Sequence, residues 1–491
     1  MKKRPVWIGC LIIAFACCVL LFHVVDNMEF CGLRVQTEEW LEAKTAEMHF
    51  VDKPENVDEL IQLDGQRIPY DRSGNTFYVS QSTEAAEYAG TFQAMGDNCE
   101  IYIQRDEALG DKQSAIAQGH VFKLWFLTAD TCTTANLVFS GLPVLSIGAE
   151  ADSLTAAYAQ GDMVVYNPDD TDINGMSVKQ SAVTVKQNEN TGTITFRLYK
   201  KAYKEERNLS LLGLGKHTSW KLYQVSEKDD TFVRTLLSVY VWNGVCGDES
   251  LQRGMGLAEV IVNDRYAGLY YLAPKAGKGF LGLQETDRIY ECEDMLEDGT
   301  QVFEVVGDED IPENYAQLDA YQSVLADLSG ENISRIDLDN YINYHIYLQA
   351  VCGIRNSQEE YYVIAQNQGN GYLYRRWPEP TEYVWGLYPS RIGWQSLTAA
   401  ENIMEDEAYH LIVEQDASVA AYTTERWNEL RQSVLSTEVL TQAAYAYEKR
   451  LADGGYIVRE AQQETYNDSC GVLQDMIIKR MDYLDSYFNG S

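Results

Sequence analysis

The segment Gly353–Gly386 reads GIRNSQEEYYVIAQNQGNGYLYRRWPEPTEYVWG, and it sets the expected fold for the second half of the chain. Within it, the apolar run Tyr361–Ala365 predicts a buried strand, and Tyr372–Tyr374 predicts a second one. The intervening Gly369–Gly371, with the sequence Gly-Asn-Gly, favours a tight turn. Just upstream, Ile336–Cys352 (IDLDNYINYHIYLQAVC) places apolar residues at helical spacing. We therefore predict a helix, a strand, a turn and a strand in this order.

This order of elements resembles the catalytic segment of the spore-coat protein H (CotH) kinase family. Members of that family typically show an Asp-x-x-x-x-Asn spacing at the first strand, and a Pro-Trp-Asp-x-Asp run with a glycine after the second. Gly386 stands in register with that glycine. The resemblance implies an atypical protein-kinase-like fold. In such chemistry a carboxylate accepts the proton of the acceptor hydroxyl, and oxygen ligands hold Mg²⁺ on the phosphates.

The positions that the resemblance would make catalytic are largely substituted. The Asp position is Arg355, and a guanidinium stays protonated and cannot act as a general base. The Asn position is Glu360, and the two Asp positions of the run fall on Pro380 and Glu382. The resemblance thus implies no catalytic residue, and it leaves Glu360 and Glu382 as weak metal candidates. The simpler interpretation is that both glutamates are solvated or paired with neighbouring arginines.

The nucleotide-binding positions that the resemblance implies are substituted as well. A lysine pair of the family falls on Thr193 and Ile194, an acidic residue falls on Pro274, and a basic residue falls on Glu291. Without these cations the protein offers little positive charge to a nucleotide phosphate. We therefore expect no cofactor, and Mg-ATP only if substitute acidic residues support an active kinase.

The most specific part of the resemblance is the block Leu211–Asn243, in which the leucines, the tryptophans and the terminal Trp-Asn pair agree with the family. Apolar residues recur at helical spacing from Phe232 onward, which predicts a helix facing the core. We expect Trp220 and Trp242 to be buried. The resemblance covers most of residues 140–491.

Composition limits the classes of function. The chain has 491 residues, a hydrophobic fraction of 45% and a net charge of −35, so two or three folded domains are expected. A surface this acidic repels nucleic acid and anionic lipid. We therefore predict no nucleic-acid partner.

The N-terminus predicts a membrane anchor. Met1–Arg4 is basic, and Val6–Val25 is an uncharged apolar run long enough to span a bilayer. The run predicts an uncleaved signal anchor, with a cleaved signal peptide as the alternative. The basic side would lie in the cytoplasm, so the bulk of this single-pass cell-membrane protein would be extracytoplasmic.

Ten cysteines occur, and three of them lie inside the apolar run. The other seven are widely spaced and never in a C-x-x-C arrangement, which argues against zinc or thioredoxin-type sites. They are Cys31, Cys99, Cys132, Cys246, Cys292, Cys352 and Cys470. Buried thiols are the favoured interpretation, and one or two disulfides of undetermined pairing are the alternative.

The remaining patterns predict the domain organisation. Short strands with polar turns indicate a small β-domain of sandwich type, in which Trp125 or Tyr78 could stack on a sugar, although core packing is the usual role of such rings. The C-terminal part is helical, with an apolar stripe from Leu473 to Leu484. The expected divisions are residues 1–5 (cytoplasmic tail), 6–25 (transmembrane anchor), 26–50 (linker), 51–137 (β-domain), 138–395 (CotH-like kinase core) and 396–491 (C-terminal helices of that core).

The fold class expected from these observations is α+β: a CotH-like, atypical protein-kinase-like core with an N-terminal β-sandwich-like domain and a C-terminal helical region, behind a membrane anchor. The favoured function is a catalytically degenerate pseudokinase that binds or scaffolds at the cell envelope. Its expected partners are the membrane, through the N-terminal helix, and an envelope protein. The alternatives are an active CotH-type phosphotransferase and a surface adhesion or glycan-binding module.

Overall fold

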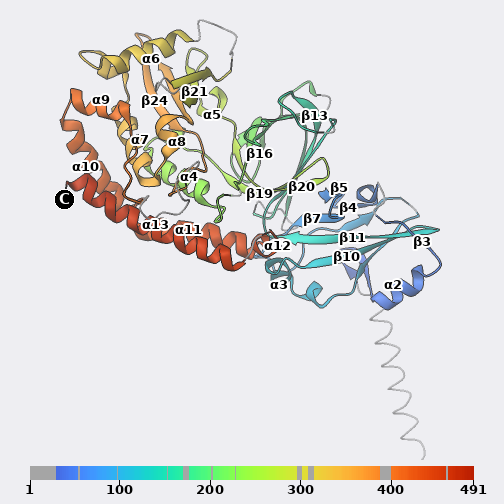
Figure 1. Cartoon of the computed structure of the whole chain (residues 1–491). Coiled ribbons are helices and arrows are strands. Elements are labelled where there is room, and N and C mark those ends of the chain that lie inside the picture. The colour runs from blue at the N-terminus through green and yellow to red at the C-terminus, as the bar shows by residue number, and fades with distance from the viewer. Residues whose placement is uncertain are drawn as a thin grey trace, which may run out of the picture.

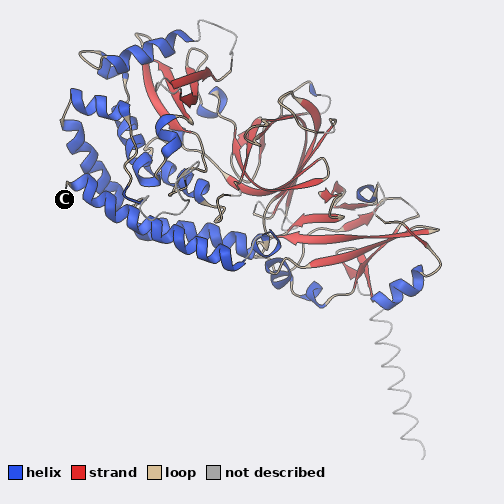
Figure 2. Cartoon of the chain, in the orientation of Figure 1, coloured by secondary structure: helices blue, strands red, loops and turns tan. Residues whose placement is uncertain are grey.

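A computed structural model describes residues 29–490, apart from residues 53–55, 97, 152, 170–175, 201–202, 227, 296–300, 308–314, 388–399 and 461–462. Figure 1 shows a strand-rich N-terminal part, a β-barrel beside it, and a mixed part of helices and strands beyond the barrel. The C-terminal helices run along one side of the molecule and reach back to the N-terminal part. Figure 2 shows how strands dominate the first two parts and helices the last.

The N-terminal part is built on an eight-stranded sheet with a three-stranded sheet beside it. The large sheet is mixed, because β7 and β11 pair in parallel, as do β2 and β9. The predicted sandwich-type β-domain is therefore wrong: this part is a mixed eight-stranded sheet with a small three-stranded sheet. The large sheet contains β1 (Glu29–Phe30), β2 (Leu33–Gln36), β3 (His49–Phe50), β6 (Tyr70–Asp71), β7 (Thr76–Ser80), β9 (Glu100–Gln104), β10 (Val121–Leu127) and β11 (Thr131–Ser140). The small sheet contains β4 (Ile61–Leu63), β5 (Gln66–Arg67) and β8 (Phe92–Ala94), and the helices are α2 (Glu38–Thr45) and α3 (Lys112–Ala117).

A closed seven-stranded barrel follows, in the order β12-β13-β14-β15-β18-β20-β19. The parallel pairing of β12 with β19 closes it, and alternate residues of each strand fill the interior, Trp220 among them with no exposed surface. The kinase-like core predicted over residues 138–395 is therefore wrong. The reason is that β12 pairs with β19, far along the chain, and so closes the strands into a barrel. They are β12 (Val144–Ala149), β13 (Ala159–Asn167), β14 (Ser177–Gln187), β15 (Ile194–Tyr199), β18 (Ser219–Gln224), β19 (Gly256–Val262) and β20 (Arg265–Pro274).

Beyond the barrel, a four-stranded sheet in the order β22-β21-β23-β24 packs against α7 (Leu338–Val351). The hairpin predicted within Gly353–Gly386 is present as β23 (Tyr361–Asn367) and β24 (Tyr372–Pro378). The helix predicted before it is α7. The other elements are α4 (Arg234–Val245), α5 (Lys278–Leu281), β21 (Arg288–Met295), β22 (Gln301–Val305), α6 (Ala316–Ala326) and α8 (Ile354–Gln358).

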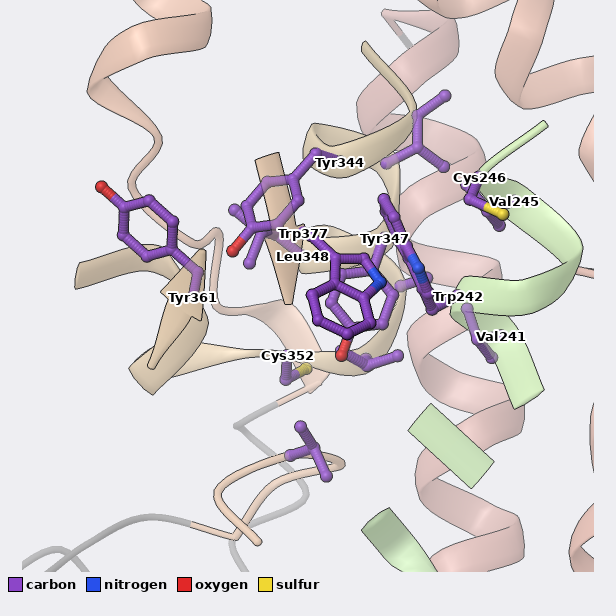
Figure 3. Close-up of a cluster of buried hydrophobic side chains, with 14 of the residues drawn as sticks. Val241, Trp242, Val245, Cys246, Tyr344, Tyr347, Leu348, Cys352, Tyr361 and Trp377 are labelled. Atoms are coloured by element: carbon purple, nitrogen blue, oxygen red, sulfur yellow. The ribbon is translucent and has the colours of Figure 1, made fainter. Parts of the chain in front are cut away.

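The core of this part forms where α4 meets α7. Trp242 of α4 is buried, and its ring stands edge-on to Tyr347 of α7 at 5.5 Å between ring centroids. Figure 3 shows this pair among apolar side chains of both helices and of the strands. The predicted burial of Trp220 and Trp242 is confirmed.

The C-terminal helices are α9 (Glu407–Gln415), α10 (Ser418–Arg431), α11 (Thr437–Asp453), α12 (Tyr456–Glu460) and α13 (Gln463–Asn489). The apolar stripe predicted for the last helix is buried, with Leu473, Ile477 and Leu484 fully covered. The prediction of a helical C-terminal part is therefore confirmed. The described cysteines form no disulfide, so the alternative prediction of one or two disulfides is not supported among them. Cys352 is buried at the end of α7. The other thiols are those of Cys31, Cys99, Cys132, Cys246, Cys292 and Cys470.

The predicted anchor, residues 6–25, lies outside the described residues. Within the described ranges, no helix combines the length and apolar character needed to cross a bilayer. The predicted single-pass location, with its cytoplasmic N-terminus, thus has no spanning helix among the described residues to support it, and the membrane partner stays a prediction.

The three parts of the molecule meet at α12, the short helix that follows the turn Gly454–Gly455. Arg459 of this helix pairs with the fully buried Glu259 of the barrel, at 2.5 Å between Nη2 and Oε1. Tyr266 donates a second hydrogen bond to Glu259, at 2.7 Å. The turn itself packs against Ile116 of α3 in the N-terminal part. We name this contact of all three parts the α12 junction.

Replacing Gly455 by alanine is expected to destabilise the α12 junction by about 2–3 kcal/mol. Gly455 has a φ of +77°, and a Cβ there would overlap the carbonyl oxygen of Ile116, which is backbone and cannot swing away. Gly369→Ala is the matched control, because Gly369 has a φ of +83° with no atom within 4 Å of the added Cβ. Urea unfolding measures both, and equal losses would show that the close approach to Ile116 costs nothing.

Candidate functional site

The structure brings together two of the segments that the sequence singled out. Arg355 lies on α8, and its Nε is 3.2 Å from Oε1 of Glu360; it also pairs with Glu359. The side-chain amide of Asn356 donates to the carbonyl oxygens of Glu360 (2.6 Å) and Glu379 (2.9 Å). The start of β23 and the end of β24 are thereby held side by side, with Arg355 at their edge.

The predicted metal candidates do not form a ligand set with these neighbours. Glu360 has a φ of +56°, and burial raises its pKa, against the opposing influence of Thr381 and Arg355. Pro380 is buried and offers no ligand, and Glu382 is only half-buried. Among the described residues, no three His, Cys, Asp or Glu side chains are arranged to hold a metal ion.

A different carboxylate, Glu379, is the electrostatic centre of this region. Its Oε1 accepts hydrogen bonds from Lys221 Nζ (2.8 Å) and the Tyr223 hydroxyl (2.6 Å), both on the outer face of the barrel strand β18. Its Oε2 accepts from Arg253 Nη1 at 2.9 Å. Arg253 is 2% exposed and stacks on Trp377, with 4.2 Å from Cζ to the ring centroid. We call these residues the Glu379 cluster.

The Glu379 cluster joins the barrel to the four-stranded sheet. Burial alone would raise the pKa of Glu379, but Lys221 and Arg253 outweigh it and lower the pKa to about 2. The same carboxylate raises the pKa of Lys221, although burial opposes this. Near neutral pH the carboxylate is therefore ionised and fully engaged. It cannot take up a proton as a general base would.

Among the four predicted nucleotide-binding positions, Glu291 lies beside Lys221 of the Glu379 cluster. Its Oε1 is 3.9 Å from Lys221 Nζ and accepts a hydrogen bond from Tyr362 at 3.1 Å. Burial raises the pKa of Glu291. Thr193 lies in the turn before β15, Ile194 is buried in the barrel interior, and Pro274 ends β20 opposite Trp220.

Sequence reasoning missed the cations of this region. Lys221 lies between Trp220 and Leu222, which point into the barrel, so the alternation of a strand places it outside. That alternation was the signal in the sequence, but it does not reveal Glu379 as the partner 158 residues away. A further lysine, Lys275, lies close enough to Lys186 and Lys221 that both lower its pKa, after burial as the main cause.

The two aromatic residues considered for glycan binding are part of the core. Trp125 is 7% exposed and Tyr78 is 8% exposed. The Tyr78 ring stacks on Tyr266 at 5.0 Å, and the Trp125 indole donates to Gln104 at 3.2 Å. Neither ring leaves a face open for a sugar.

Comparison of the sequence with models of protein families and with curated proteins gives no match.

Proposed function

We propose that this protein is a divergent CotH-like protein that lacks phosphotransferase activity and works by binding or scaffolding a protein partner. The proposal rests on one observation: the charged side chains at the positions of the family's catalytic segment bind each other. Arg355 occupies the position of the base and pairs with Glu359 and Glu360, while the neighbouring Glu379 is neutralised by Lys221 and Arg253.

Internal pairing of this kind removes the groups that phosphoryl transfer needs. A base must be able to accept a proton, and Mg²⁺ needs carboxylate oxygens that are open to it. Glu379, with a pKa of about 2, meets neither condition because three donors already occupy its oxygens. The Glu379 cluster is well suited to hold the barrel against the four-stranded sheet. A fixed arrangement of the two would give a protein partner a rigid surface to bind.

The alternative function, an active phosphotransferase, is favoured by one observation. Burial and, after it, the neighbouring Lys186 and Lys221 lower the pKa of Lys275, and Glu291 opposes them. Such a group of lysines could attract phosphate despite the acidic charge of the whole chain. Nucleotide binding therefore separates the two functions.

The full chain is expected to show no Mg-dependent ATP binding and no ATP turnover. Calorimetric titration with Mg-ATP up to about 5 mM, above the usual range of enzyme KM values, should give only heats of dilution. Saturable binding that Glu360→Gln and Glu382→Gln together abolish would overturn the proposal in favour of the active enzyme. Saturable binding unaffected by these changes, but accompanied by phosphate release, would overturn it equally.

A further inference from the structure

A cavity lies at one end of the barrel. It has a volume of about 780 Å³, within the range of ligand-binding pockets, and the mouths of β-barrels are common positions for such pockets. Its walls come from the ends of strands: Gly148 and Ala149 at the end of β12, Tyr199 at the end of β15, and the β19–β20 turn at Asn263 and Asp264. We name it the barrel-mouth cavity.

Two tyrosines form the aromatic part of this cavity. Tyr199 and Tyr203 are half-buried, and their ring centroids lie 5.9 Å apart at an angle of 55°. The Tyr203 hydroxyl donates to the carbonyl oxygen of Gly161 at 2.8 Å, and its backbone has a left-handed φ of +55°. The hydrogen bond holds the ring in place. The left-handed backbone conformation of Tyr203 is uncommon and persists only where the surrounding structure enforces it.

Polar groups of both kinds complete the walls. Asp162 and Glu150 are exposed carboxylates, and Gln180 is an exposed amide that can donate and accept. Arg67 and Arg207 supply guanidinium donors, with Arg67 partly held by Asp264 at 2.5 Å. Two aromatic rings beside mixed donors and acceptors suit a ligand with apolar faces and many hydroxyl groups.

We propose that the barrel-mouth cavity binds a neutral saccharide. An anion is disfavoured by Asp162 and Glu150 and by the net charge of −35. A cation is disfavoured by Arg67 and Arg207 in the same walls. A sugar ring can lay its C–H face on Tyr199 while its hydroxyls bond to Asp162 and Gln180. The inference goes beyond the proposed function, since it adds a saccharide ligand to the protein partner proposed above.

Binding is tested on the full chain with three neutral trisaccharides: cellotriose, maltotriose and N,N′,N″-triacetylchitotriose. We expect saturation-transfer NMR and calorimetry to detect at least one of them, with a dissociation constant of about 1 mM or tighter. Tyr199→Ala and Asp162→Ala should each weaken that binding at least about tenfold, because each removes one of the two recognition elements. Asp162 is exposed, so its substitution leaves the fold intact even if Tyr199→Ala does not.

Tyr445→Ala is the matched control, because Tyr445 is 57% exposed on α11 and lies outside the cavity walls. It should leave saccharide binding unchanged. No binding of any of the three trisaccharides would overturn the inference, as would binding that Tyr199→Ala and Asp162→Ala leave unaltered. Tighter binding of spermidine or tripolyphosphate at this cavity would overturn it too. ATP turnover would refute the proposed function alone, so the two failures can be told apart.

Discussion

Glu379→Ala is expected to lower the free energy of unfolding by about 3–5 kcal/mol, because it removes one member of a buried ion cluster and leaves its partners without compensation. Arg253 is 2% exposed and would keep its stacking on Trp377, but it would lose its carboxylate. Lys221 would lose its hydrogen bond of 2.8 Å as well. Urea unfolding of the full chain measures the loss.

Glu382→Gln is the matched control for Glu379. Glu382 lies three residues further along, is only half-buried and forms no ion pair among the residues that the structure describes. Its substitution should change the free energy of unfolding by less than about 0.5 kcal/mol. Equal effects of the two changes would show that the Glu379 cluster does not hold the barrel to the sheet.

The Glu379 cluster also predicts the dependence of stability on pH. The pKa of Glu379 is lowered from an ordinary 4.5 to about 2, so the unfolded chain takes up this proton before the native one does. The contribution of ionised Glu379 to the free energy of unfolding is roughly 3 kcal/mol. It is therefore fully present above pH 4.5 and is lost as the pH falls towards 2. The difference in stability between wild type and Glu379→Gln should narrow over this interval. A difference that stays constant would contradict the assignment.

Trp242→Ala is expected to cost about 3–5 kcal/mol, mainly through the cavity that it leaves between α4 and α7. The Trp242 ring is 1% exposed and packs edge-on against Tyr344 and Tyr347 (Figure 3). Its Nε1 donates to the carbonyl oxygen of Leu251 at 2.8 Å, but Trp377 donates to the same oxygen at 2.8 Å. That carbonyl would keep a partner, so lost packing accounts for most of the cost.

Trp40→Ala removes the same side chain from the surface, where Trp40 is 37% exposed on α2. It should cost no more than about 1 kcal/mol. Denaturant unfolding distinguishes the two variants. A loss below about 1 kcal/mol for Trp242→Ala would mean that α4 is not part of the core.

Local patterns in the sequence predicted the elements that short-range contacts define. The spacing of apolar residues in Ile336–Cys352 gave the buried helix α7, and the Gly-Asn-Gly turn gave the hairpin of β23 and β24. Trp220 and Trp242 were also predicted to be buried, because they lie in the block Leu211–Asn243 where the resemblance is most specific, and both are buried.

Features that depend on distant pairing could not be predicted in this way. The barrel closes because Val144 pairs with Glu259, and nothing near either residue indicates the other. Resemblance in short motifs therefore misled the prediction of a kinase-like core, since motifs constrain neighbouring residues and not the order of strands in a sheet. The Glu379 cluster was missed for the same reason: Lys221, Arg253 and Glu379 meet only after the barrel has docked on the sheet.

The α12 junction has a consequence for folding of the nascent chain on the ribosome. Glu259 is fully buried, yet Arg459, which neutralises it, is made 200 residues later. At typical rates of synthesis of about 5–20 residues per second, about 10–40 s would pass between the synthesis of Glu259 and that of Arg459. During that interval the carboxylate of Glu259 has its hydrogen bonds from Ser140 and Tyr266 but lacks the cation that pairs with it. A chain whose synthesis stops before Arg459 should therefore be an early substrate for chaperones and proteases, even though every strand of the barrel has already been made.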